Sequence, residues 1–240
     1  MPTPPVDPKL IDWITTEDGS ITGYRSDLGL HYKSIFGAQT ESRKVFVEGT
    51  GITTLEQQWT VGELGFGLGS NFSQTAVAAE QCNRPLLYIG IDFQPPPAER
   101  TPPKQPYSHL IQAVLETVQH TGQTAEVSDG QITLRLHPNH WNQVTDNTII
   151  DAAFHDPFAP ANNPESWTAE CFNWWKSWLN PNARLATYSA AGHVRRALAS
   201  AGFWVARAPG PGRKREITVA SRNQHALAPV SYTHLTLPTS

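Results

Sequence analysis

The feature that most constrains the fold is a glycine-rich stretch in which Gly65, Gly67 and Gly69 alternate with other residues. An apolar run, residues 58–64, precedes it, and a helix-like run begins at Ser70. The pattern predicts a tight turn between a strand and a helix. Glycine adopts backbone angles that other residues avoid and lets a ligand approach the main chain. The first N–H groups of the following helix can bind an anion. We therefore expect a nucleotide-like cofactor here; a turn without a ligand is the alternative.

The spacing of these glycines differs from the dinucleotide-binding fingerprint, in which two residues separate the last two glycines. Here the glycines alternate strictly, and the acidic residue Glu63 precedes them. This arrangement resembles the loop of methyltransferases that use S-adenosylmethionine (SAM), where the loop wraps the methionine part of the cofactor. The resemblance implies a set of cofactor contacts from this stretch: Glu63, Gly65, Phe66, Gly67, Gly69 and Asn71.

Two further apolar runs end in an aspartate. Residues 86–91 lead to Asp92, and residues 148–154 lead through His155 to Asp156. An acid at the end of the strand that follows the glycine loop can accept hydrogen bonds from both hydroxyls of a ribose. Asp92 is therefore a candidate cofactor-binding residue, with a helix cap as the alternative. Because ligands bind at the carboxyl ends of parallel strands, Asp156 is expected at the same site.

The alternation of strands and helices predicts an α/β, Rossmann-like sheet that is mostly parallel. Strands are expected at 131–136, 184–189 and 216–221, and helices at 108–119, 166–179 and 192–201. SAM-dependent methyltransferases, which the pattern resembles, have an antiparallel last strand. The helix at 166–179 is rich in tryptophan; we expect core packing, with a platform for stacking bases as the alternative.

The domain organisation follows from these elements. Residues 1–55 are expected to form a small N-terminal β cap, including a strand at 43–51, and residues 56–222 the methyltransferase domain. The segment 223–240 is expected to be a tail that is not native, because its end resembles translated cloning sequence.

Composition narrows the environment and the partners. The chain has 240 residues and no apolar run near the roughly 20 residues that span a bilayer. Cys82 and Cys171 lie far apart, and the nine histidines show no metal-ligand spacing. We therefore expect a cytoplasmic protein without a metal or a membrane partner. With a formal net charge of −3, any nucleic-acid contact must be local, and the densest basic cluster is residues 213–215.

The stretch DPFAPANNPESWT, residues 156–168, allows a family to be named. It resembles the Asp-Gly-Phe-Ala-Pro-x-Lys-Asn-Pro-x-x-Trp-Thr signature of the MnmC-like methyltransferases, which methylate the aminomethyl group on the tRNA wobble uridine. Further similarities to this family, and to its stand-alone MnmD-type members, lie within residues 18–46, 63–72, 185–203 and 210–216.

The resemblance implies SAM as cofactor, tRNA as substrate and Asp156 as the catalytic residue, which would also contact the cofactor. It also implies substrate contacts from Tyr32 and Asn163. Phe158 and Pro160 would form a wall of the pocket, with packing within their loop as the alternative. Lys214 and Arg215 could contact tRNA phosphates, with a solvated charged hairpin as the alternative. The flavin-dependent oxidase half of the fused members has no counterpart in the sequence, so a separate oxidoreductase is expected to act earlier in the pathway. The acidic Gly-Asp pair of the family is replaced at residues 136–140, so the adenine contacts stay unassigned.

The chemistry of Asp156 can be argued from the residue itself. An alkylamine has a pKa near 10.4, as in lysine, so it must lose a proton before it can attack a methyl group. Asp156 could hold the ammonium and accept that proton once water is excluded; a structural cap of its loop is the alternative. Two other functions stay open: methylation of a small amine or a protein, and SAM binding without catalysis.

Overall fold

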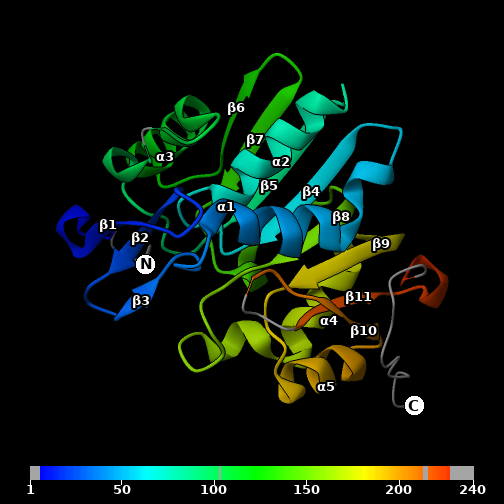
Figure 1. The fold of residues 1–240 in the computed structure, drawn as a ribbon. Coiled ribbons are helices and arrows are strands. Elements are labelled where there is room, and N and C mark those ends of the chain that lie inside the picture. The colour runs from blue at the N-terminus through cyan, green and yellow to red at the C-terminus, as the bar shows by residue number, and fades with distance from the viewer. Residues whose placement is uncertain (1–5, 103, 213–215, 228–240) are drawn as a thin grey trace.

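The computed structural model describes residues 6–102, 104–212 and 216–227. Within these residues the centre of the molecule is an eight-stranded sheet with the order β10-β11-β9-β8-β4-β5-β7-β6 (Figure 1). Strands β9, β8, β4, β5 and β7 run parallel to one another, whereas β6 and β11 run antiparallel to their neighbours. The predicted α/β, Rossmann-like class and the antiparallel last strand are therefore confirmed. The strands are β4 (Trp59–Leu64), β5 (Leu86–Ile91), β6 (Ala125–Asp129), β7 (Ile132–His137), β8 (Ile150–His155), β9 (Leu179–Thr187), β10 (Trp204–Pro209) and β11 (Glu216–Ser221).

Helices cover both faces of this sheet, as Figure 1 shows. Neighbouring residues of a strand point to opposite faces, so on β5 Tyr88 joins one hydrophobic core and Ile89 the other. The first core contains the buried sides of α2 and α3, and the second those of α4 and α5. These helices are α2 (Ser70–Gln81), α3 (Ser108–Thr121), α4 (Ala169–Trp178) and α5 (Gly192–Ser200).

The N-terminal segment forms a separate antiparallel sheet of three strands, followed by a helical stretch. The strand predicted at 43–51 is wrong, because these residues continue a helix. Val45, Phe46 and Val47 are all buried in the core on the α2 side. A short apolar run of this kind fits a buried strand and a buried helix equally well. The elements are β1 (Ile11–Thr15), β2 (Ile21–Arg25), β3 (Leu30–His31), α1 (Ala38–Glu41) and a π-helix (Ser42–Glu48).

Other boundaries also differ from the prediction. The helix expected from residue 166 begins at Ala169, because Thr168 caps it by accepting a hydrogen bond from the backbone N–H of Cys171 at 3.2 Å. Strand β6 was not predicted because its sequence is largely polar, and β10 was also missed. The 3₁₀ helices are Pro8–Leu10, Ile52–Thr54, Ala98–Arg100, Trp141–Gln143, Pro164–Trp167 and Gln224–Leu227.

The predicted start of the tail, at residue 223, lies too early in the sequence. Leu227 is fully buried in the first core, and the carbonyl of Ala226 accepts a hydrogen bond from the Arg184 side chain at 2.5 Å. Residues 223–227 therefore belong to the folded body, and the rest of the expected tail lies outside the described residues.

The tryptophan-rich helix α4 packs into the core rather than presenting a stacking platform. Trp175 is fully buried and Trp178 is 3% exposed, while Trp174 packs against both rings with centroid distances of 4.8 and 5.1 Å. No helix among the described residues is long and apolar enough to cross a membrane. The same residues contain no group of three or more His, Cys, Asp or Glu side chains that could hold a metal ion.

Candidate active site

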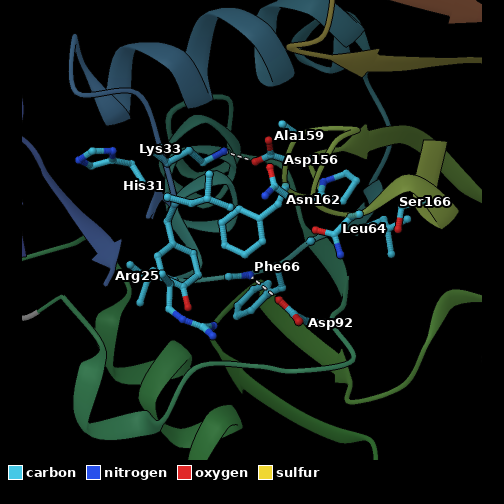
Figure 2. A pocket seen from close by; sticks show the side chains of 18 of the residues that line it. Arg25, His31, Lys33, Leu64, Phe66, Asp92, Asp156, Ala159, Asn162 and Ser166 are labelled. Carbon is cyan, nitrogen blue, oxygen red and sulfur yellow. Dashed lines mark hydrogen bonds and ion pairs between the residues drawn. The ribbon is translucent and has the colours of Figure 1, made fainter. Parts of the chain in front are cut away.

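A pocket of about 570 Å³ lies at the carboxyl ends of β4, β5 and β8. The chain leaves β4 toward β5 on one side and later returns to β8 on the other, so this is the topological switch point of the sheet. Residues of the N-terminal segment close the opposite wall (Figure 2). The volume falls within the range of about 300–1,000 Å³ that is usual for small-molecule sites.

The glycine loop adopts the geometry that its sequence predicts. Gly65, Gly67 and Gly69 all have positive φ angles, of 89°, 52° and 71°. A Cβ atom on Gly65 would lie 2.5 Å from the backbone oxygen of Asp156, and one on Gly67 would lie 2.9 Å from the Tyr32 ring. Glycine is therefore required both by the backbone conformation and by the close approach of the loops after β4 and β8.

Asp92 ties the end of β5 to this loop. Its carboxylate accepts hydrogen bonds from the backbone N–H groups of Gly67 at 2.8 Å and of Gln94 at 3.0 Å. Burial raises the pKa of Asp92, and the two backbone hydrogen bonds oppose that effect. The side chain also lines the pocket, so it can both fix the glycine loop and meet polar groups of a ligand.

We expect Asp92→Ala to weaken SAM binding by about 10- to 100-fold. A hydrogen bond to a charged group contributes about 1.5–3 kcal/mol, and each 1.4 kcal/mol is about tenfold in affinity. Calorimetric titration with SAM measures the change. Asp129→Ala serves as the matched control, because Asp129 is an exposed aspartate on β6 that does not line the pocket. Equal dissociation constants for the wild type and Asp92→Ala would contradict a cofactor contact from Asp92.

The loop that carries Asp156 is held in place by three hydrogen bonds. The backbone N–H of Asp156 donates to the carbonyl of Leu64 at 2.9 Å, which joins the ends of β8 and β4. The Tyr188 hydroxyl donates to the carbonyl of Pro157, and the Trp167 indole donates to that of Phe158, both at 2.9 Å. The Asp156 side chain therefore has a fixed position at the pocket wall, next to the glycine loop.

A buried polar network lies behind this wall. The Asn71 amide, on the first turn of α2, donates to Glu63 at 2.5 Å and to Asp156 at 2.8 Å. The Tyr88 hydroxyl donates to the other oxygen of Glu63 at 2.7 Å. Lys33 donates to both Asp156 and Asn71. Glu63 and Asn71 lie behind the residues that line the pocket, and their contact with the cofactor stays a prediction.

Burial raises the pKa of Glu63 from 4.5 to about 8, although Lys33 opposes this effect. Between these two pH values the folded protein keeps a proton that the unfolded chain releases. The Glu63 contribution to the free energy of unfolding therefore falls as the pH rises from about 4.5 to about 8.

We expect Glu63→Gln to remove this pH dependence, because glutamine is neutral throughout and can still donate and accept hydrogen bonds. The melting temperature of the variant minus that of the wild type should increase from pH 5 to pH 8 and then level off. Thermal melts in a series of buffers measure the difference. A difference that is constant with pH would mean that Glu63 is not protonated in the folded protein.

The residues predicted to contact the substrate separate into three groups. Tyr32 and Phe158 line the pocket as a ring pair with centroids 5.5 Å apart, and Asn163 also lines it. Pro160 belongs to the same loop but does not line the pocket, because the turn presents Ala159 and Asn162 instead. Lys214 and Arg215 lie outside the described residues.

Several pocket residues were not predicted from the sequence. Lys33 reaches Asp156 across 123 residues of sequence, and Asn139, His140 and Trp141 form a wall for which no role was assigned. The sequence gives little indication of a role for Lys33, because a single lysine in a loop belongs to no periodic pattern and has no partner residue at a characteristic spacing. Exposed large apolar side chains also gather at the pocket: Leu28, Ile35, Phe36 and Phe93.

A parallel sheet, a glycine loop at its switch point and an acid on the adjacent strand define a Rossmann-like protein that binds a nucleotide-type cofactor. A family model described as "S-adenosyl-L-methionine-dependent methyltransferase" matches residues 103–223. The chain belongs to this family of SAM-dependent methyltransferases, and its cofactor is SAM. The glycine cradle that a Cβ atom would fill and the Asp92 carboxylate fit that cofactor.

Relatives with known names narrow the resemblance to the MnmC type. The chain is 33% identical over 206 residues to the tRNA 5-methylaminomethyl-2-thiouridine biosynthesis bifunctional protein MnmC of Cupriavidus necator. The match covers 79% of the chain but only 31% of that relative, so the chain spans about a third of its length.

A solved structure of an MnmC-type protein agrees with this assignment. MnmC2 from Aquifex aeolicus superposes with a TM-score of 0.73 at 28% identity, covering 89% of this chain and 70% of that chain. The spermidine synthase of Thermotoga maritima has a TM-score of 0.56 at 11% identity, covering 89% of this chain and 69% of that one. The second likeness concerns the fold alone.

Proposed function

We propose that the protein transfers the methyl group of SAM to the 5-aminomethyl group of (2-thio)uridine at the wobble position of tRNA. The observation that carries this proposal is the buried Asp156 carboxylate, which lines the pocket directly beside the glycine loop. A carboxylate at this position can accept a hydrogen bond from the amine nitrogen. The tRNA-modifying relative from Cupriavidus necator supports the identity of the amine.

The residues that line the pocket have different roles in the proposed reaction. SAM supplies a methyl group that is already activated by its sulfonium. The chain therefore has to align the amine with that methyl group and keep the amine unprotonated. Asp156 orients the nitrogen and is the nearest base for its proton, while Tyr32 and Phe158 form an apolar wall that excludes water.

The rest of the tRNA would lie outside the pocket. Phe36 and Phe93 are exposed at the pocket and offer faces on which neighbouring bases can stack. Lys214 and Arg215, beyond β10, would contact phosphates. With tRNA as its substrate, the protein would act in the cytoplasm. A separate oxidoreductase would act earlier in the same pathway.

Methyl transfer to defined tRNA tests the proposal. Purified protein and labelled SAM are incubated with tRNA that carries 5-aminomethyl-2-thiouridine, with the same tRNA lacking the aminomethyl group, and with spermidine as a small amine. Nucleoside mass spectrometry should show one added methyl on the modified uridine alone. Labelling of spermidine instead would favour a small-amine methyltransferase, and SAM binding without any transfer would favour an inactive binding protein.

A further inference from the structure

A lysine ammonium is buried against the proposed catalytic carboxylate. Lys33 follows β3 in the N-terminal segment, and its Nζ atom donates to Oδ2 of Asp156 (Figure 2). The same Nζ atom donates to Oδ1 of Asn71 at 2.7 Å. Only 7% of the Lys33 side chain and 6% of the Asp156 side chain are exposed. The Asn71 amide donates to the same Oδ2 atom. The other oxygen of Asp156, Oδ1, can therefore accept a hydrogen bond from a ligand in the pocket.

The position of Lys33 is fixed from several directions. Besides the two oxygen partners, its Nζ atom lies 4.7 Å from the centre of the Phe46 ring, which adds a cation–π contact. Lysine is a costly residue to bury, because its charge must be fully compensated. A methionine or leucine would fill the same space at lower cost, so the charge itself calls for an explanation.

The charges around Asp156 indicate what that explanation is. Among the described residues, the Glu41 carboxylate also acts on Asp156, and Asp156 in turn acts on the carboxylate of Glu63 and on the hydroxyls of Tyr88 and Tyr188. Burial raises the pKa of Asp156 to about 6 and that of Glu63 to about 8, while Lys33 lowers both. At neutral pH Glu63 keeps its proton, and among the described residues Lys33 is the cation that pairs with the Asp156 carboxylate.

This compensation matters for an amine substrate. An uncompensated carboxylate would bind the amine as its ammonium ion, which has no lone pair with which to attack a methyl group. With Lys33 already paired to Asp156, an incoming ammonium would instead meet a buried cation of like charge, and like charge disfavours the charged form.

We propose that Lys33 is a positioning residue whose ammonium compensates Asp156, so that the substrate amine is held as the uncharged nucleophile. The inference rests on the proposed function and deepens it. The amine R–NH₃⁺ passes one proton to Asp156, which releases it to solvent, and one of the two remaining N–H groups then donates to Oδ1 of Asp156. The nitrogen lone pair then forms the N–C bond while the C–S bond of SAM breaks and its electron pair stays on sulfur. The methylated ammonium loses its second proton to solvent.

The test compares pH profiles of kcat on aminomethylated tRNA between pH 6 and 10 for the wild type, Lys33→Met and Lys33→Arg. In Lys33→Met we expect kcat at pH 7 to fall at least tenfold and the midpoint of the profile to move up by about one pH unit or more. At pH 9.5 the rate should return to within about threefold of the wild type. Lys33→Arg keeps the charge and should keep the midpoint of the wild type.

A second uncharged variant protects the test against misfolding. Lys33→Gln retains a hydrogen-bond donor for Asp156 and Asn71, and it should show the same shifted midpoint as Lys33→Met. Thermal melts and SAM titrations identify which of the two variants is folded.

The possible results separate the two proposals. A wild type that transfers no methyl group to aminomethylated tRNA overturns the proposed function and this inference together. If the wild type is active but the kcat of the variants falls equally at all pH values, or does not fall, only the proposed role of Lys33 is overturned.

Discussion

Asp156→Asn is expected to lower methyl transfer to aminomethylated tRNA by about 10²- to 10⁴-fold at neutral pH, the range found for a positioned acid or base. Asparagine keeps the size of the side chain and one oxygen acceptor, so the substitution tests the negative charge. SAM binding should persist, because the glycine loop is held by Asp92 and not by Asp156. Single-turnover methyl transfer and calorimetric titration with SAM measure the two effects separately.

The Lys33–Asp156 pair supplies the control for this experiment. Asp156→Asn removes the carboxylate that pairs with the buried Lys33 ammonium, and breaking a buried ion pair costs about 3–5 kcal/mol. The single variant should therefore melt at a lower temperature. The double variant Lys33→Met, Asp156→Asn should recover much of that stability without recovering activity. Methyl transfer by Asp156→Asn at the parental rate would show that Asp156 is structural.

Much of the site could be predicted because its central parts are local in sequence. Strand β4, the three glycines and the start of α2 follow one another within residues 59–81, and each carries its own pattern of apolar residues or turns. Asp92 and Asp156 were found by the same means, since each directly follows a buried strand. Parallel strands bring their carboxyl ends together, so local patterns were enough to expect convergence.

The parts that were missed depend on contacts between distant segments. Residues 43–48 are helical because Val45, Phe46 and Val47 pack against the main sheet, and nothing in the run itself distinguishes a helix from a strand. Lys33 meets Asp156 only because the N-terminal segment closes over the end of β8. Such pairings depend on how whole elements pack, which a single sequence does not specify by periodicity.

Gly65→Ala is expected to abolish measurable SAM binding, with affinity reduced by more than about 100-fold, which corresponds to about 2.7 kcal/mol. The new Cβ atom would lie 2.5 Å from the backbone oxygen and 2.8 Å from the Pro157 nitrogen in the loop of Asp156. These are main-chain atoms that cannot rotate away, so the loops after β4 and β8 must separate. The separation would break the alignment of the glycine cradle with Asp156. Calorimetric titration with SAM and thermal melting of the same samples measure the loss.

A second glycine distinguishes this clash from the strain of a positive φ angle. Gly122, after α3, has a φ angle of 66°, against 89° at Gly65, and a Cβ atom there would meet nothing within 4 Å. Alanine at a position that requires a positive φ angle costs on the order of 1–3 kcal/mol, which at this chain length lowers the melting temperature by about 2–4 °C per kcal/mol. Gly122→Ala should show that modest loss with normal SAM affinity. If Gly65→Ala also bound SAM normally, the close contact between the two loops would not be needed to form the cofactor site.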